Sequence, residues 1–160
     1  MKKFYAFASS EIDPDFVSKE IMETIGAPYS HCGVIAEEDD SETIYHATGK
    51  GFHSQDIPSF LAEGKQFVHK FELKLTVHPE FALGFLEGNI GKEYSESQYL
   101  GFINKRFEKL VENGAEKLIC SEALTLFALK CCGLQKSNLT EGTDFIDPKE
   151  AIELARLVAK

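Results

Sequence analysis

The pattern of hydrophobic and polar positions along this chain switches between short strand-like runs and longer stretches with helical spacing. Apolar and β-branched residues dominate 31–36 and 43–48, and the polar segment between them predicts a turn, so the two runs form a hairpin. Residues 4–8 and 69–77 predict two further strands, the second from its regular alternation. Residues 49–64 contain scattered Gly, Ser and Pro, which predicts a loop.

Five other stretches carry the spacing or the capping signals of helices. The first begins at Asp13, as N-cap, with Pro14 as its first residue, and ends at Gly26. The other predicted helices cover residues 79–86, 98–113, 121–132 and 148–160, the last of them starting at Asp147-Pro148. These elements together predict an α+β fold, with a small antiparallel sheet packed against helices.

One cysteine stands where a short apolar run meets a predicted helix. Cys120 directly precedes the helix at 121–132, whose apolar residues recur at i, i+3 and i+4. A cysteine at a helix N-terminus is close to unpaired backbone N–H groups and to the positive end of the helix dipole. Both favour the thiolate, which is the nucleophilic form of the side chain. Cys120 is therefore a candidate catalytic nucleophile.

Two histidines in the predicted hairpin supply the groups that such a nucleophile needs. His31 opens the first strand and His46 lies in the second, so the hairpin places them on neighbouring strands. An imidazole next to a thiol accepts its proton and later protonates the leaving group. A third polar side chain holds that imidazole in the useful tautomer. This order predicts Cys120 as nucleophile, His31 as base and His46 as the group that orients His31.

Three short motifs, in this order, resemble those of a known superfamily: SHCGVI at 30–35, IYHA at 44–47 and ICSEAL at 119–124. They are similar to motifs of the circularly permuted papain-fold enzymes of the NlpC-type superfamily, in particular the YaeF/YiiX-like amidases. Lecithin:retinol acyltransferase-like proteins share the same order and are more distant. The segment GKEY at 91–94 weakly resembles a Gly-x-x-Tyr segment of the amidase group.

The resemblance implies a single permuted papain-like domain over residues 1–160, with the nucleophile at a helix N-terminus. His31 matches the family's base, Cys120 its nucleophile, and His46 the third polar position. The amidases usually have an acidic residue there, whereas the acyltransferase-like proteins have histidine. The resemblance implies a cysteine amidase or peptidase that needs no cofactor and cleaves a peptide, isopeptide, peptidoglycan-like or acyl-amide bond. Acyl transfer or lipid hydrolysis, and a non-catalytic binding module, are the alternatives.

The composition of the chain limits which classes of binding partner and which cellular location are expected. The net charge is −9, which disfavours nucleic acid, and no apolar run is long enough to span a bilayer. The N-terminal apolar stretch is too short for a signal peptide, so we expect a cytoplasmic protein, although viral origin or leaderless release is also compatible. The four cysteines do not form a disulfide framework, in keeping with a reducing compartment. The oligomeric state stays open.

The remaining cysteines and histidines have simpler predicted roles. Cys32 follows His31 on the same strand, so its side chain is expected on the opposite face, in the core. Core or near-surface positions are predicted for Cys131 and Cys132, and solvated positions for His53, His69 and His78. A zinc site made by Cys120, His31 and His46 is the rival chemistry, but the short paired ligand spacings of structural zinc sites are missing.

Overall fold

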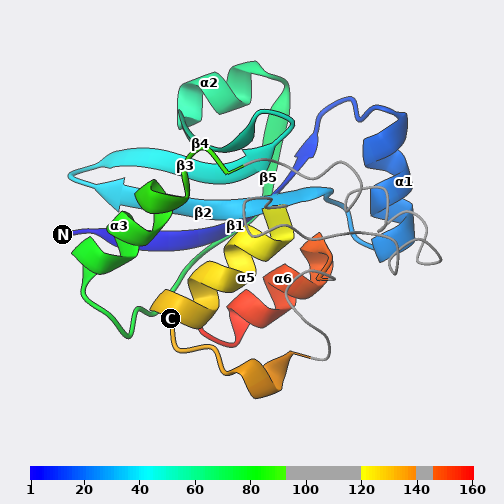
Figure 1. Cartoon of the computed structure of the whole chain (residues 1–160). Helices are drawn as coiled ribbons and strands as arrows, with labels where there is room; N and C mark the ends of the chain where they lie inside the picture. Colours follow the sequence, from blue (N-terminus) through cyan, green and yellow to red (C-terminus); the bar gives the residue numbers. More distant parts are fainter. Residues whose placement is uncertain (93–119, 140–145) are drawn as a thin grey trace.

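Five strands form one antiparallel sheet in the order β4-β3-β2-β1-β5, seen edge-on across the centre of Figure 1. The computed structural model describes residues 1–92, 120–139 and 146–160. The strands are β1 (Lys3–Glu11), β2 (His31–Glu38), β3 (Ser41–Thr48), β4 (Gly51–Asp56) and β5 (Lys65–Glu72). The predicted α+β class, with an antiparallel sheet and packed helices, is confirmed.

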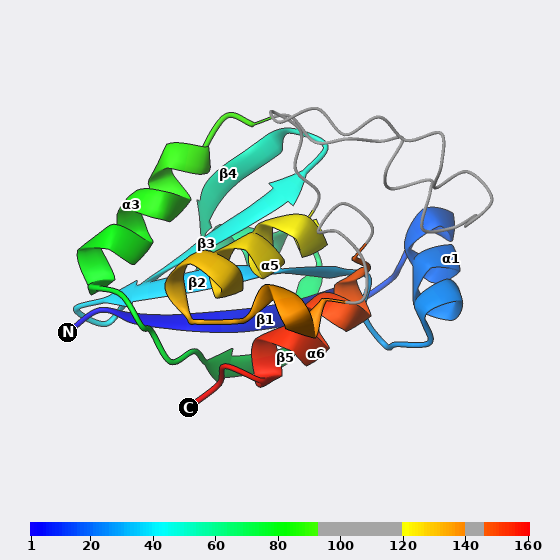
Figure 2. The same cartoon turned by 60° about the horizontal axis from the view of Figure 1, so that its bottom comes forward.

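Helices cover both faces of the sheet. In the described parts of the chain they are α1 (Phe16–Ile25), α2 (Ile57–Ala62), α3 (Pro79–Asn89), α5 (Cys120–Cys131) and α6 (Pro148–Arg156), with a 3₁₀ turn at Lys136–Asn138. Figures 1 and 2 show α3, α5 and α6 on one face, α2 on the other, and α1 beyond one end of the sheet. α5 packs on β2 and β3.

Strand alternation divides the core into two clusters, one on each face. Along β1, Phe4, Ala6 and Ala8 face α5 and α6, while Phe7 faces α2. The alanines leave room for the helices to lie close to the sheet. The smaller cluster, under α2, consists of Phe7, Ile35, Ile44 and Phe60, all of them fully buried.

Two helix starts test the predicted capping signals. The prediction for α6 is confirmed, because Asp147 caps it, accepts from the N–H of Glu150 at 2.9 Å, and precedes Pro148. The prediction for α1 is wrong: Asp15, not Asp13, is the N-cap and accepts from the N–H of Ser18 at 2.7 Å. A side chain caps a helix only from the residue where the backbone is still extended, and here that residue follows the proline.

The predicted loop at 49–64 is also wrong, since it contains β4 and α2. Phe52 alternates with polar neighbours and is buried, which is a strand pattern, and Asp56 caps the short α2 that buries Phe60. The strand predicted at 69–77 begins earlier, as β5, and ends at Glu72. The final helix ends at Arg156, before the predicted Lys160. The helix predicted at 98–113 and Tyr94 of the GKEY segment lie outside the described residues.

Candidate functional site

Two neighbouring strands separate at the point where the candidate residues lie. Pairing of β2 with β3 extends from Glu38–Ser41 to Val34–Tyr45 and stops there. Beyond it, residues 31–33 pair with β1, and residues 46–48 pair with β4. The start of β2 therefore has no β3 partner on one side, and its backbone groups on that side are available to another element.

Gly33 lies at the point of separation and has no room for a side chain. A Cβ atom there would lie 2.7 Å from Cε1 of Phe7 and 2.7 Å from the carbonyl oxygen of Tyr45. Both distances are far below van der Waals contact, and the second neighbour is backbone. Glycine is thus required sterically between the two histidine-bearing strands.

His31 and His46 meet across this opening. The Nε2 atom of His31 lies 2.8 Å from the Nδ1 atom of His46, a hydrogen bond between the two imidazoles. The ring centroids are 5.0 Å apart with an interplanar angle of 72°. The predicted hairpin is confirmed, and it brings the two histidines into direct contact. Since Nε2 of His31 is occupied, Nδ1 is the ring nitrogen that remains for another partner.

His46 is enclosed by aromatic rings. Its side chain is fully buried, with ring centroids of Phe60 at 5.7 Å, Phe7 at 6.4 Å and His53 at 4.6 Å. Burial, reinforced by His31, His53 and Lys65, lowers the pKa of His46 to about 2. His46 is therefore neutral at ordinary pH.

The second ring nitrogen of His46 is poorly satisfied. Its Nε2 atom is buried and makes no well-formed hydrogen bond to the described residues. Of the described residues, Gln55 on β4 interacts with His46 through its side chain and opposes the lowering of the His46 pKa, but its effect is smaller than those of burial, His31, His53 and Lys65. A buried polar atom without a good partner costs about 1–3 kcal/mol, so folding alone does not account for histidine here.

Cys120 is the first residue of α5, one residue earlier than the predicted helix start, and is 3% exposed. Its sulfur lies next to Cys32 and His31, which both interact with it. The Cys32 thiol contributes most to lowering the pKa of Cys120 well below its ordinary value, and His31 adds to it, against the opposing effect of burial. The thiolate is the favoured form.

Contact with both Cys32 and His31 follows from the separation of the strands. The side chains of consecutive strand residues point to opposite faces, but a backbone N–H lies in the plane of the sheet. Because the Cys120 sulfur interacts with both the thiol and the backbone N–H of Cys32, it lies beside β2, where β3 would otherwise pair. From that position the sulfur reaches the side chain of Cys32 on one face of the sheet and that of His31 on the other.

Two residues were missed by the sequence reasoning. Cys32 is fully buried in the core cluster under α5, as predicted, but its thiol also contacts Cys120. The adjacency of His31 and Cys32 on one strand was the available signal. His53 is not solvated as predicted: it is half-buried against His46, with Nδ1 3.0 Å from the carbonyl oxygen of Gly51.

The other two histidines lie apart from the histidine pair. His69 is half-buried, not solvated as predicted, and packs edge-on against Tyr29 at 5.5 Å. His78 is exposed and caps α3. Cys131 and Cys132 are buried at the other end of α5, and burial raises the pKa of Cys131 to about 11 and of Cys132 to about 12. Of the four thiols, Cys120 is the one whose pKa is lowered.

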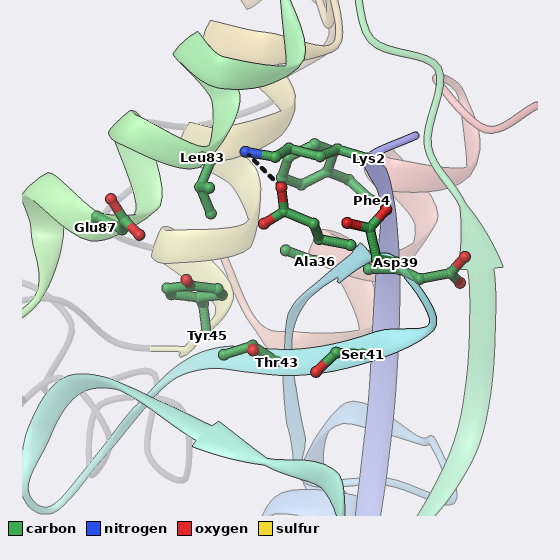
Figure 3. Close-up of a pocket in the computed structure, with 11 residues that line it drawn as sticks. Lys2, Phe4, Ala36, Asp39, Ser41, Thr43, Tyr45, Leu83 and Glu87 are labelled. Atoms are coloured by element: carbon green, nitrogen blue, oxygen red, sulfur yellow. Dashed lines mark ion pairs between the residues drawn. The ribbon is translucent and has the colours of Figure 1, made fainter.

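A separate cavity of about 460 Å³ lies between α3 and the β2–β3 hairpin (Figure 3). Lys2 crosses it and pairs with Glu38 at 3.1 Å and with Glu80 at 2.8 Å. Its lining combines apolar and acidic groups: Lys2, Phe4, Ala36, Glu37, Glu38, Asp39, Ser41, Thr43, Tyr45, Leu83 and Glu87. Neither Cys120 nor the two histidines line this cavity.

Among residues 1–92, 120–139 and 146–160, no group of three or more His, Cys, Asp or Glu side chains is arranged to hold a metal ion. No helix in these ranges has the length and apolar character to cross a membrane.

Comparisons with known proteins identify the fold. No family model matches the chain, and no curated protein matches it in sequence. Among solved structures, the chain is similar to the metalloprotein YiiX from Escherichia coli O157:H7, with a TM-score of 0.62 and 13% identity. The match covers 96% of this chain and 92% of YiiX. The chain therefore has a YiiX-like fold.

Proposed function

We propose that this protein is a cysteine hydrolase that cleaves an amide bond through an acyl-enzyme on Cys120. The observation that carries the proposal is the contact of the Cys120 sulfur with His31, whose other ring nitrogen is 2.8 Å from His46. A nucleophile, a base and a group that orients the base are the three parts of this chemistry. The three motifs that resemble those of permuted papain-fold amidases support the same assignment.

In the proposed reaction His31 acts first as base and then as acid. The Cys120 thiol transfers its proton to Nδ1 of His31, and the thiolate attacks the carbonyl carbon of the substrate. The tetrahedral intermediate collapses when the imidazolium protonates the leaving nitrogen, which departs as an amine and leaves a thioester on Cys120. His31 then deprotonates a water molecule, whose attack on the thioester releases the carboxylic acid and restores the thiol.

His46 acts on this sequence through His31. With its own proton on Nε2, His46 accepts a hydrogen bond from the Nε2–H of His31 through Nδ1. This bond holds the ring so that the Nδ1 atom of His31 faces the sulfur. Because His46 is neutral, it stabilises the imidazolium less than the carboxylate found at this position in the resembling amidases would.

The start of α5 supplies hydrogen-bond donors for the oxyanion of the tetrahedral intermediate. The first N–H groups of a helix have no partner within the helix and point outward from its N-terminus. Cys120 is the first residue of α5, so these donors lie next to the carbon that the sulfur attacks. They are the proposed oxyanion site.

The proposed substrate is an amide: a peptide, an isopeptide or a cell-wall peptide. Acyl transfer or lipid ester hydrolysis is the alternative, favoured by one observation, the histidine at position 46 that the acyltransferase-like proteins also carry. The same thioester serves both reactions, and they differ in whether water or another acceptor releases the acyl group. A non-catalytic binding module on this fold would form no thioester.

Trapping of the acyl-enzyme tests the proposal. Wild-type protein would be mixed with peptide amides, acyl amides and acyl esters, and the acyl adduct located by intact and peptide mass spectrometry. We expect an adduct on Cys120 that is absent in Cys120→Ala, and turnover reduced about 10²- to 10⁴-fold in His31→Ala. Cys131→Ala is the matched control and retains activity. A folded wild-type protein that acquires no adduct across the panel would refute the proposal in favour of a binding module.

A further inference from the structure

Two thiols meet where α5 begins and β2 starts. The thiols of Cys32 and Cys120 interact, and both residues belong to one core cluster, with 0% and 3% of their surface exposed. All four cysteines are free thiols. Hydrolysis requires a single sulfur, so the proposed function leaves Cys32 without a chemical role.

The two sulfurs are chemically unequal. Contacts from Cys32 and His31 lower the pKa of Cys120, whereas burial and the neighbouring Cys120 raise the pKa of Cys32 well above its ordinary value. One sulfur is therefore an anionic nucleophile, and the other a protonated thiol in contact with it. A reactive thiolate next to a second thiol is the arrangement of redox-active cysteine pairs.

We propose that Cys120 and Cys32 form a peroxide-reactive dithiol, in which Cys120 reduces a small hydroperoxide and Cys32 then closes a disulfide between α5 and β2. The proposal rests on the same Cys120 thiolate as the proposed hydrolysis, but not on hydrolysis itself. Since Cys120 is nearly buried, hydrogen peroxide is the substrate that fits the access best.

The first step oxidises Cys120 by two electrons. Its thiolate attacks one oxygen of hydrogen peroxide, the O–O bond breaks, and the departing hydroxide takes a proton from the His31 imidazolium and leaves as water. Cys120 is then a sulfenic acid. In the second step the Cys32 thiol attacks the Cys120 sulfur and gives up its proton. The S–O bond breaks, and the hydroxide takes that proton and leaves as a second water.

The position of the pair suits this second step. Two interacting thiols need only a small approach to reach the S–S length of about 2.0 Å. The other candidates, Cys131 and Cys132, lie at the far end of α5, with pKa values raised to about 11 and about 12. Closure of the disulfide would remove the nucleophile reversibly and protect it from irreversible oxidation.

Peptide mapping after oxidation tests the proposal. Reduced wild-type protein would be treated with stoichiometric hydrogen peroxide, its free thiols blocked in denaturant, and the peptides mapped before and after dithiothreitol. We expect a Cys32–Cys120 cross-link that dithiothreitol removes, with Cys131 and Cys132 still free. In Cys32→Ser, Cys120 should proceed to sulfinic acid. Cys132→Ser, which removes another buried thiol, should behave as wild type.

Three results would overturn the proposal: Cys120 reaching sulfinic acid in wild type as fast as in Cys32→Ser, a disulfide through another cysteine, or no oxidation of Cys120. The cross-link in wild-type protein decides the matter even where Cys32→Ser fails to fold. Acylation of Cys120 without the cross-link would overturn the dithiol alone. The cross-link without acylation would overturn the hydrolase alone.

Discussion

Replacing His46 with leucine separates a functional histidine from a structural one. The ring is fully buried among Phe7 and Phe60, its Nε2 has no well-formed partner in the described residues, and its Nδ1 is hydrogen-bonded to His31. Leucine has a similar volume and suits these surroundings. If His46 is present to orient His31, His46→Leu should preserve stability and impair the chemistry of Cys120.

The two magnitudes follow from the contacts. Removing the poorly satisfied Nε2 recovers about 1–3 kcal/mol, which offsets the lost hydrogen bond and the repacking cost. The free energy of unfolding should then stay within about 1 kcal/mol of wild type at pH 7. A hydrogen bond to a charged group contributes about 1.5–3 kcal/mol, so the imidazolium–thiolate pair should lose about 10- to 100-fold in population.

Urea unfolding measures the first quantity, and the second-order rate of iodoacetamide alkylation of Cys120 at pH 6.5, followed by peptide mass spectrometry, measures the second. His78→Ser is the control, since it removes an exposed histidine while keeping a residue able to cap α3. A loss of more than about 2 kcal/mol in stability with unchanged alkylation would refute the reasoning and make His46 a structural residue.

Three further predictions concern the same region. Gly33→Ala should destabilise the protein by about 1–3 kcal/mol in urea unfolding, because its Cβ would lie 2.7 Å from Phe7 and from the Tyr45 carbonyl oxygen. Gly84→Ala, in open space on α3, is the control and should be neutral or stabilising. Equal effects of the two substitutions would contradict this prediction. Because the pKa of His46 is lowered to about 2, the unfolded chain binds a proton that the folded chain does not between pH 6.5 and about 2. The contribution of neutral His46 to the free energy of unfolding is complete above pH 6.5 and is lost as the pH falls, by at most about 1.4 kcal/mol per pH unit. The pH dependence of stability should therefore be weaker in His46→Leu than in wild type. An equal dependence in both proteins would contradict the burial of His46. Dialysis against EDTA should leave Cys120 alkylation unchanged, and a change would point to a bound metal.

How much the sequence could predict is clearest at the hairpin and the helix that follows it. The apolar and β-branched runs at 31–36 and 43–48 predicted β2 and β3, and through them the contact of His31 with His46. The apolar spacing after Cys120 predicted α5 to within one residue. These patterns are informative because all three elements are largely buried in the core.

The sequence failed where tertiary packing decides. Residues 49–64 have the composition of a loop, yet pairing with β3 and burial of Phe60 make them a strand and a helix. The contact of Cys32 with Cys120 depends on where β3 separates from β2, while β2 continues to pair with β1 and β3 with β4. Such a three-strand arrangement leaves no periodic signal in any one segment.

The most direct test of the account is the pH dependence of Cys120 alkylation by iodoacetamide in wild type and in His31→Ala. Cys131 and Cys132, whose pKa values are raised by burial, serve as references in the same chain. The account predicts a fast reaction of Cys120 that persists well below pH 8.5, the ordinary pKa of a free thiol being about 8.5, and that is lost in His31→Ala. A slow reaction with the pH dependence of an ordinary thiol in both proteins would contradict it.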